Sequence, residues 1–309
     1  MDKTPSHLHL IPTPARERRT NQPDLFAYEN GRAVGLASRY MADERVDPVY
    51  GHPGLCLTVL PHRVTPPAEV WRRESPYATL TVHPLEGVDG RYRGVPYGPK
   101  ARLILLYLMT EAVKTRSREI ELGRSMRAWL KAMAVPICGS NYQAVADQAD
   151  RIEHAVLRFR VRDEAGEAML QDSIIRGAFR PFAADGGEHT VQLSEGFYQA
   201  ITRRPVPVVE GALRLLADTC MPLDLYLWLA YRLHALEAPT PVSWTSLHRQ
   251  FGANTRLVKH FRPRAARDLR LALAVYPEAR VEVTGEGVVL HPSPPPVAPR
   301  PLAAPGFDT

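Results

Sequence analysis

A concentration of positive charge between residues 256 and 270 is the feature of this sequence best suited to chemistry. The stretch holds six Lys and Arg side chains and one acid, Asp268. A guanidinium group pairs with phosphate through two parallel hydrogen bonds, and it can bind the O6 and N7 atoms of guanine together. A solvated helix often balances its cations with acids three or four residues away, and such acids are scarce here. The stretch therefore favours contact with an anionic polymer over an ordinary solvated surface.

The same stretch separates an apolar face from a basic face when it is read as a helix. At about 100° per residue, one arc collects Val258, Phe261, Ala265, Leu269, Ala272 and Tyr276. The side chains that lie away from this arc, and that we expect to contact DNA, are Arg256, Lys259, His260, Arg264, Arg267 and Arg270. Because proline has no amide donor, the helix either begins at Pro263 or bends there.

The elements around the basic helix follow the order of a winged helix. An apolar helix over 221–236 precedes a short strand over 240–244, and a brief helix capped by Ser243 follows. A turn with Gly252 leads into the basic helix, and a two-stranded hairpin over 279–292 comes last. In a helix-turn-helix the second helix enters the major groove, and its N-terminal residues contact base edges.

A similar order occurs about 120 residues earlier. A helix over 97–115, a strand over 117–123 and a helix capped by Ser125 precede a helix over 141–157 with apolar steps of three and four. The outward face of this last helix carries Gln143 and Arg151. Three interpretations of that face stay open, namely base contact, packing against a partner subunit and plain surface.

Three arginines alternate along the strand that follows, at Arg158, Arg160 and Arg162. Phe159 and Val161 occupy the opposite face, as period-two alternation requires. With a return strand over 168–175, this segment would form the wing of the first domain, and its arginines would contact phosphate. Neutralisation by nearby acids is the alternative. The repetition rests on element order rather than residue identity, so two unrelated α+β domains also remain an alternative.

Length and composition are consistent with two domains and an anionic partner. The chain has 309 residues, a formal net charge of +6 and three cysteines without a CxxC pair. Neither a disulfide framework nor a cysteine metal site is indicated. The N-terminal residues lack a signal core, and the longest near-apolar run, 101–110, is too short to span a bilayer. We expect a cytoplasmic protein, associated with the nucleoid or a plasmid and without membrane contact.

The sequence predicts a mainly helical α+β chain with tandem winged-helix domains and disordered proline-rich tails. Strands are expected at 55–60 and 78–83 within the N-terminal extension. The expected parts are a basic arm over 1–30, the extension over 31–95, winged-helix domains over 96–200 and 201–292, and a tail over 293–309.

Several stretches resemble the RepA-type replication initiators encoded by plasmids of Gram-negative bacteria. The similarity runs from about residue 55 to residue 297, and the segment from 96 to 129 is the most specific. The stretches are LCLTVLPHR, VPYGPKARLILLYLMTEAVKTRSREIELGRSMRAWL, NYQAVADQADRI, SWTSLHRQFG and YPEARVEVTGEGVVLHPSPPPV. Pro263 departs from an uninterrupted recognition helix.

The resemblance implies a protein that binds repeated sites (iterons) in origin DNA and helps to open the origin. It also implies recruitment of the host replication initiator and replicative helicase machinery, and repression of the protein's own promoter. A homodimer is a further partner hypothesis, with the balance between monomer and dimer left open. A transcriptional repressor of winged-helix type is the alternative with the same chemistry.

No enzymatic activity, cofactor or metal is expected. The rival is a rolling-circle nickase, which needs two rigidly presented histidines and a divalent metal. His7 and His9 have that spacing, but they lie in a proline-rich tail without a strand around them. No phosphate-binding G-x-x-x-x-G-K-[ST] sequence is present.

Overall fold

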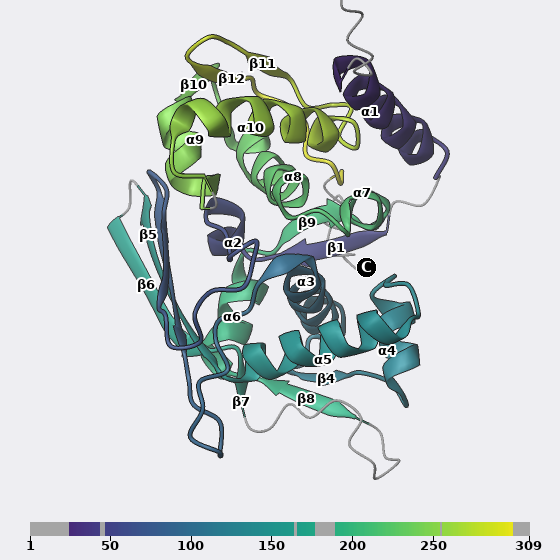
Figure 1. Cartoon of the computed structure of the whole chain (residues 1–309), viewed down its shortest axis with the longest axis vertical. Helices are drawn as coiled ribbons and strands as arrows, with labels where there is room; N and C mark the ends of the chain where they lie inside the picture. Colours follow the sequence, from purple (N-terminus) through teal and green to yellow (C-terminus); the bar gives the residue numbers. More distant parts are fainter. Residues whose placement is uncertain (1–24, 44–46, 164–165, 177–188, 254, 299–309) are drawn as a thin grey trace, which may run out of the picture.

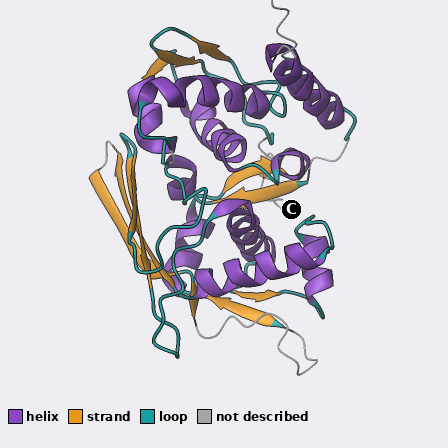
Figure 2. Ribbon diagram, viewed as in Figure 1, coloured by secondary structure: helices purple, strands orange, loops and turns teal. Residues whose placement is uncertain are grey.

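The computed structural model describes residues 25–43, 47–163, 166–176, 189–253 and 255–298. Helices and strands are mixed along the chain, as expected (Figures 1 and 2). No helix in these ranges is long and apolar enough to cross a bilayer. The expected tails lie largely outside the described residues, but α1 (Leu25–Met41) is a helix, so a disordered arm does not extend to residue 30.

A first unit is built on the buried helix α3. Its apolar residues between Leu103 and Met109 are almost all buried, and this explains why the sequence is apolar on most sides there. Ser125 caps α4 by accepting a hydrogen bond from the amide of Ala128, as the sequence predicts. The elements of the first unit are α3 (Gly98–Thr115), β4 (Glu119–Glu121), α4 (Met126–Ala132), α5 (Gly139–Glu153), β7 (Ile175–Arg176) and β8 (Thr190–Leu193).

A second unit repeats this order on the buried helix α8. Ser243 caps α9 through the amide of Ser246, and the capping prediction is confirmed here too. The elements of the second unit are α8 (Cys220–Arg232), β10 (Thr240–Ser243), α9 (Trp244–Phe251), α10 (Val258–Leu273), β11 (Val281–Val283) and β12 (Gly287–Leu290).

The small sheets of the two units share one strand order. In the first unit the order is β4-β8-β7, and in the second it is β10-β12-β11. The central strand is the last strand of each unit, β8 or β12. On one side it pairs with the strand between the first two helices, β4 or β10, and on the other side with the strand just before it in the chain, β7 or β11. The correspondence thus extends from element order to strand pairing.

A layer of secondary structure lies between the units. β1 (Pro48–Gly51) pairs with β9 (Val206–Val209), and Figure 1 shows this ribbon between α3 and α8. α6 (Glu195–Arg203) crosses the expected boundary between residues 200 and 201, and α7 (Glu210–Leu216) follows β9. One continuous hydrophobic core runs through both units and this layer.

The hairpin with the alternating arginines exists, but its place in the fold differs from the prediction. β5 (Ala155–Asp163) and β6 (Gly166–Ser173) pair as expected. They join β2 (Trp71–Glu74) and β3 (Ala78–Pro84) in a four-stranded sheet of order β2-β3-β5-β6. The strands that complete the sheet of the first unit are β7 and β8, so the assignment of β5–β6 as its wing is wrong. The strand predicted at 78–83 is confirmed.

The strand predicted at 55–60 is also wrong, because residues Pro53–Leu57 form the short helix α2. Proline is favourable in the first turn of a helix, where no amide donor is needed. His52 caps the helix, and its Nδ1 accepts a hydrogen bond from the amide of Gly54 at 3.0 Å. The local start signal therefore overrides the β propensity of the residues that follow.

Candidate nucleic-acid interface

Helix α10 separates its two faces as the wheel predicts. Phe261, Ala265 and Leu269 are buried against the second unit, and α10 packs on α8. The exposed candidates from the sequence are Arg256, Lys259, His260, Arg264 and Arg270. These exposed cations therefore lie on the outer side of α10, away from its buried face, and we call them the basic surface.

Arg267 differs from the other candidates on this helix. Its Nε donates to Oδ1 of Asp268 at 3.0 Å, and its side chain is 39% exposed. Asp268 is itself buried. The charge of Arg267 is thus partly balanced within the protein, and this residue lies on the flank of the basic surface.

Helix α10 begins at Val258 and contains Pro263 in its interior. The basic helix therefore does not begin at the proline. Proline cannot donate to the carbonyl four residues earlier, which is that of Lys259. Pro263 is exposed, so water can bond the free carbonyl. The break in hydrogen bonding therefore falls on the outer side of the helix, beside the basic residues.

One basic residue near this surface escaped the wheel analysis. Arg262 is exposed, and its guanidinium lies 5.8 Å from the ring centre of Trp244, the first residue of α9. A cation over an indole face is attracted by the ring quadrupole. Only the tertiary packing of α9 against α10 brings the two together.

Helix α5, the counterpart of α10, presents a less basic surface. Gln143 is exposed, as expected. Arg151 is not an outward cation: its Nε pairs with Asp147 at 2.9 Å, its guanidinium lies 5.0 Å from the ring centre of Tyr97, and its side chain is 15% exposed. The structure therefore ties Arg151 to the body of the first unit.

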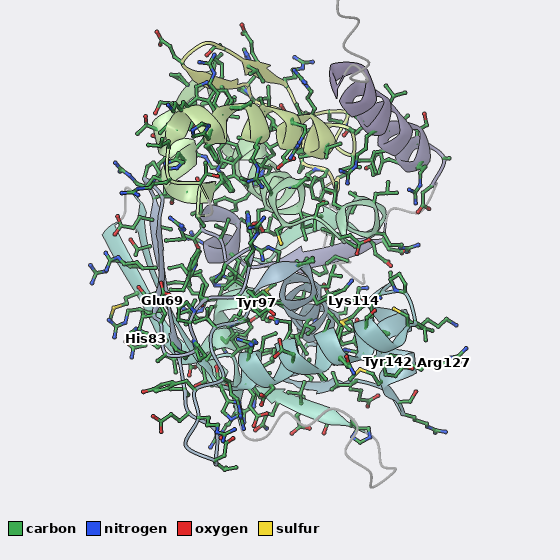
Figure 3. All side chains as sticks on the ribbon, viewed as in Figure 1. Glu69, His83, Tyr97, Lys114, Arg127 and Tyr142 are labelled. Atoms are coloured by element: carbon green, nitrogen blue, oxygen red, sulfur yellow. The ribbon has the colours of Figure 1, made fainter. Side chains whose placement is uncertain are left out.

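Basic residues that the sequence analysis missed lie on and before α4. Arg124, Arg127 and Lys131 are all exposed. Arg127 and Lys131 are four residues apart, and this spacing is the readable signal, because it places both side chains on one face of α4. Figure 3 labels Arg127 and Tyr142, which lie at the side of the molecule where α4 and α5 are found. In a helix-turn-helix, the first helix crosses the phosphate backbone.

Arg158 and Arg160 of β5 lie on the outer face of the four-stranded sheet. Arg158 donates from Nε to Oε1 of Gln171 at 2.7 Å, and Arg160 is exposed. The side chain of Arg162 lies outside the described residues. Arg72 of β2 shares this face through the strand register, and it is paired with Glu74. β2 contacts α9, so the sheet borders the second unit.

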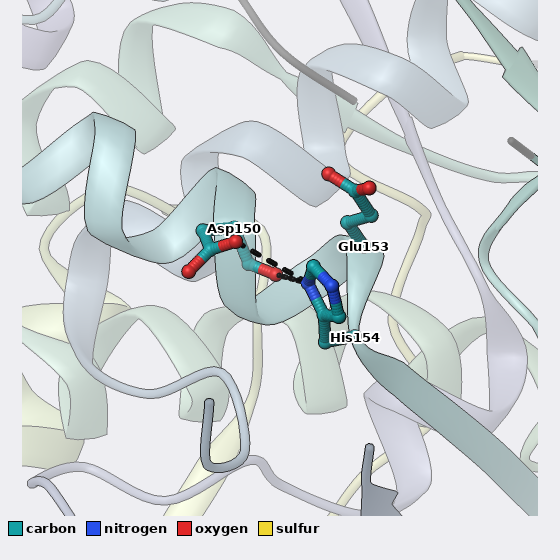
Figure 4. Close-up of side chains that lie close together, drawn as sticks. All are labelled: Asp150, Glu153 and His154. Carbon is teal, nitrogen blue, oxygen red and sulfur yellow. Dashed lines mark hydrogen bonds and ion pairs between the residues drawn. The ribbon is translucent and has the colours of Figure 1, made fainter. Parts of the chain in front are cut away.

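One group of acids and histidine lies at the end of α5 among the described residues (Figure 4). Nδ1 of His154 donates to the carbonyl oxygen of Asp150 at 2.8 Å, and it lies 3.3 Å from Oδ1 of the same residue. Arg93 lies 3.3 Å from the other carboxylate oxygen of Asp150. Glu153 completes the group. His154 thus bonds to the last turn of α5, and Arg93 supplies a positive charge beside the carboxylate of Asp150. His7 and His9 lie outside the described residues.

Comparison with known proteins gives a family match and matches among the solved structures. The family described as plasmid encoded RepA protein matches residues 95–244. Crystal structures of domains 2 and 3 of RctB align with TM-scores of 0.43 at 13% and 14% identity. They cover 71% and 76% of this chain, and 83% and 94% of the RctB chains. No curated protein matches.

The matched region includes the helices α3, α4, α5 and α8 and the strands β5 and β6 of the four-stranded sheet. It ends at Trp244, the first residue of α9. It includes the segment from 96 to 129 that carries the most specific motifs. Residues 95–244 therefore match the RepA family model, and the resemblance of this chain to plasmid replication initiators is confirmed.

Proposed function

We propose that this protein initiates plasmid replication by binding double-stranded origin DNA sequence-specifically through two winged-helix units. The observation that carries the proposal is the outer face of α10, where exposed cations stand opposite a buried apolar face. The matching order of elements and of sheet strands in the two units supports the winged-helix assignment.

In this proposal, α10 is the main recognition helix. Lys259, His260 and Arg264 lie in its N-terminal half, the half that contacts base edges in a helix-turn-helix. Arg270 lies further along and contacts the backbone, and Arg256 contacts phosphate before the helix begins. Arg267 contributes from the flank, where its Nε donates to Asp268.

The first unit positions the protein with fewer base contacts. Gln143 on α5 is the exposed residue suited to reading a base, since an amide can bind adenine through two hydrogen bonds. Arg124, Arg127 and Lys131 supply phosphate contacts beside it. Arg158, Arg160 and Arg162 extend the positive surface along the neighbouring sheet.

The consequences for replication follow from binding rather than from covalent chemistry. Distortion of the bound DNA would help to open the origin, and the bound protein would recruit the host initiator and helicase. Binding near its own promoter would repress transcription of its gene.

Footprinting of the intact protein on DNA flanking its gene tests the proposal. We expect protection of tandem direct repeats beside an AT-rich stretch. Protection of a single palindrome over the promoter would instead indicate a repressor. Metal-dependent nicking, with protein attached to the 5′ end, would contradict the non-enzymatic part.

A further inference from the structure

A buried ion pair joins the central helices of the two units. Nε of Arg102 on α3 lies 2.6 Å from Oδ1 of Asp224 on α8, and Nη2 lies 2.8 Å from Oδ2. Each side chain is 5% exposed. Two parallel bonds between a planar guanidinium and a carboxylate fix orientation as well as distance.

Arg102 also bonds to a third segment, the loop before β2, and to the first residue of α3. Nη1 of Arg102 donates to the carbonyl oxygens of Pro61 and Gly98 at 3.2 and 2.9 Å, and Nη2 donates to that of Leu60 at 2.8 Å. Nε2 of His62 lies 2.8 Å from Oδ2 of Asp224. Burial opposes ionisation of Asp224, but Arg102 and His62 hold the pKa of its carboxyl below the usual value.

The β1–β9 ribbon adds a second connection between the same two helices. The amide of Tyr50 on β1 donates to Oγ1 of Thr110 on α3 at 2.9 Å. The amide of Val209 on β9 donates to the hydroxyl oxygen of Tyr226 on α8 at 3.0 Å. Hydrogen bonds thus run from α3 through the ribbon to α8.

Each joined helix lies directly beneath a candidate recognition helix. α3 packs against α5, and α8 packs against α10. Figure 1 shows α5 and α10 on opposite sides of this central layer along the long axis of the molecule. The Arg102–Asp224 pair is therefore one helix away from each DNA-reading helix.

We propose that the cluster of Arg102, Asp224 and His62 determines the spacing at which the protein reads DNA. By holding α3 and α8 in one orientation, it fixes α5 relative to α10. The ligand is then a two-part double-stranded site whose halves must lie at one helical phase. A buried ion pair adds little net stability compared with apolar residues of similar volume, whereas apolar surfaces in its place could slide past one another. This inference rests on the proposed DNA binding, but its geometric part can be tested without DNA.

The geometric test measures the distance between α5 and α10 by pulsed electron resonance. Spin labels are attached in the full chain at Gln143→Cys and Lys259→Cys, with Cys138→Ser and Cys220→Ser to remove accessible thiols. We expect one narrow distance distribution, which broadens or shifts in the double variant Arg102→Met with Asp224→Leu. Arg102→Lys keeps the charge but loses the paired geometry, so it should broaden the distribution less. Arg214→Met is the control, because it breaks a 2.6 Å pair with Glu210 within α7 alone.

The binding test first selects duplexes from a random pool with the unsubstituted protein. Footprinting then defines the two protected half-sites, and the number of base pairs between them is varied. Inserting half a helical turn, about 5 base pairs, should weaken binding of the unsubstituted protein about tenfold or more. The double variant should lose most of this spacer preference while it keeps its affinity for an isolated half.

The two experiments distinguish failure of the proposed DNA binding from failure of the proposed role of the cluster. If the unsubstituted protein selects no sequence, the proposed function fails, and the distance measurement still decides the role of the cluster. If folded variants retain the narrow distribution and the spacer preference, the cluster does not set the spacing. Should the double variant not fold, the Arg102→Lys variant decides the question by the same two measurements.

Discussion

The imidazole ring of His248 and the phenyl ring of Phe261 meet edge to face, with centroids 5.3 Å apart and planes at 73°. His248 lies on α9 and Phe261 on α10, so the contact joins α9 to the helix that carries the basic surface. Nε2 of His248 also donates to the carbonyl oxygen of Thr255 at 2.5 Å, in the connection between these helices. One side chain thus supports both the turn and the angle of α10.

Replacing an exposed cation of α10 should reduce specificity without unfolding the protein. Arg264→Ala is expected to weaken binding to the selected site by about 1–3 kcal/mol if the guanidinium binds guanine in the bidentate way. Binding to random DNA should weaken much less, because base contacts carry the sequence information. Fluorescence titration against both duplexes measures the ratio, and an unchanged ratio would falsify the base contact.

Leu269→Ala is the matched control on the buried face of the same helix. Leu269 is 3% exposed, so its truncation should cost about 2–5 kcal/mol of unfolding free energy. Any loss of DNA binding should then follow the fraction unfolded in a urea titration. Arg264→Ala, by comparison, should leave the urea midpoint nearly unchanged.

Phosphate contacts should appear in the salt dependence of binding. The slope of log K against log salt is expected to decrease by about 0.9 for each phosphate that a variant no longer binds. We expect this for Arg127→Ala in the first unit and for Arg160→Ala on the sheet. Arg72→Ala is a comparison with Arg127→Ala: Arg72 is paired with Glu74 at 2.6 Å, so its loss should change the slope less. A slope that stays constant in Arg127→Ala and Arg160→Ala would leave these residues as solvated surface.

Two glycines of the hairpin β11–β12 should differ in their tolerance of a methyl group. A Cβ at Gly287 would overlap the carbonyl oxygen of Val242 and lie 2.8 Å from the Cα of Ser243, whereas a Cβ at Gly285 meets nothing within 4 Å. Gly287→Ala should therefore lower the unfolding free energy by about 1–3 kcal/mol. Gly285→Ala should change it little, and thermal unfolding of the two variants provides the comparison. Equal melting temperatures would mean that β10 and β12 do not approach as described.

Burial of His52 should make the protein less stable in acid. Desolvation lowers the pKa of this imidazole to about 4 from an ordinary 6.5. The unfolded chain therefore takes up its proton first as the pH falls, so stability present above about 6.5 is lost progressively down to about 4. The loss from this group is expected to be about 3 kcal/mol.

His52→Asn isolates that contribution, since asparagine can still cap α2. Urea unfolding at several pH values should show a weaker pH dependence in the variant than in the unsubstituted protein. Parallel curves would show that His52 is not buried in its neutral form.

The helices were largely predictable from residues close together in the chain. Burial of an apolar stripe every three or four residues is a local pattern, and it located α3, α5, α8 and α10. Ser125 and Ser243 were recognised as caps because capping involves only the next three residues. The motifs within 96–129 likewise indicated the RepA family directly.

Strand pairing and side-chain pairing were decided by the tertiary structure. A strand edge offers the same backbone donors and acceptors whatever its side chains, so the sequence around Arg158 could not show that β5 joins β3. The inward turn of Arg151 depends on Tyr97, and the Arg102–Asp224 pair joins residues 122 positions apart. The sequence by itself determined the helices α3, α5, α8 and α10 and which face of α10 is basic. Only the fold decided which cations remain outward and how the two units are joined, because both depend on contacts between distant segments.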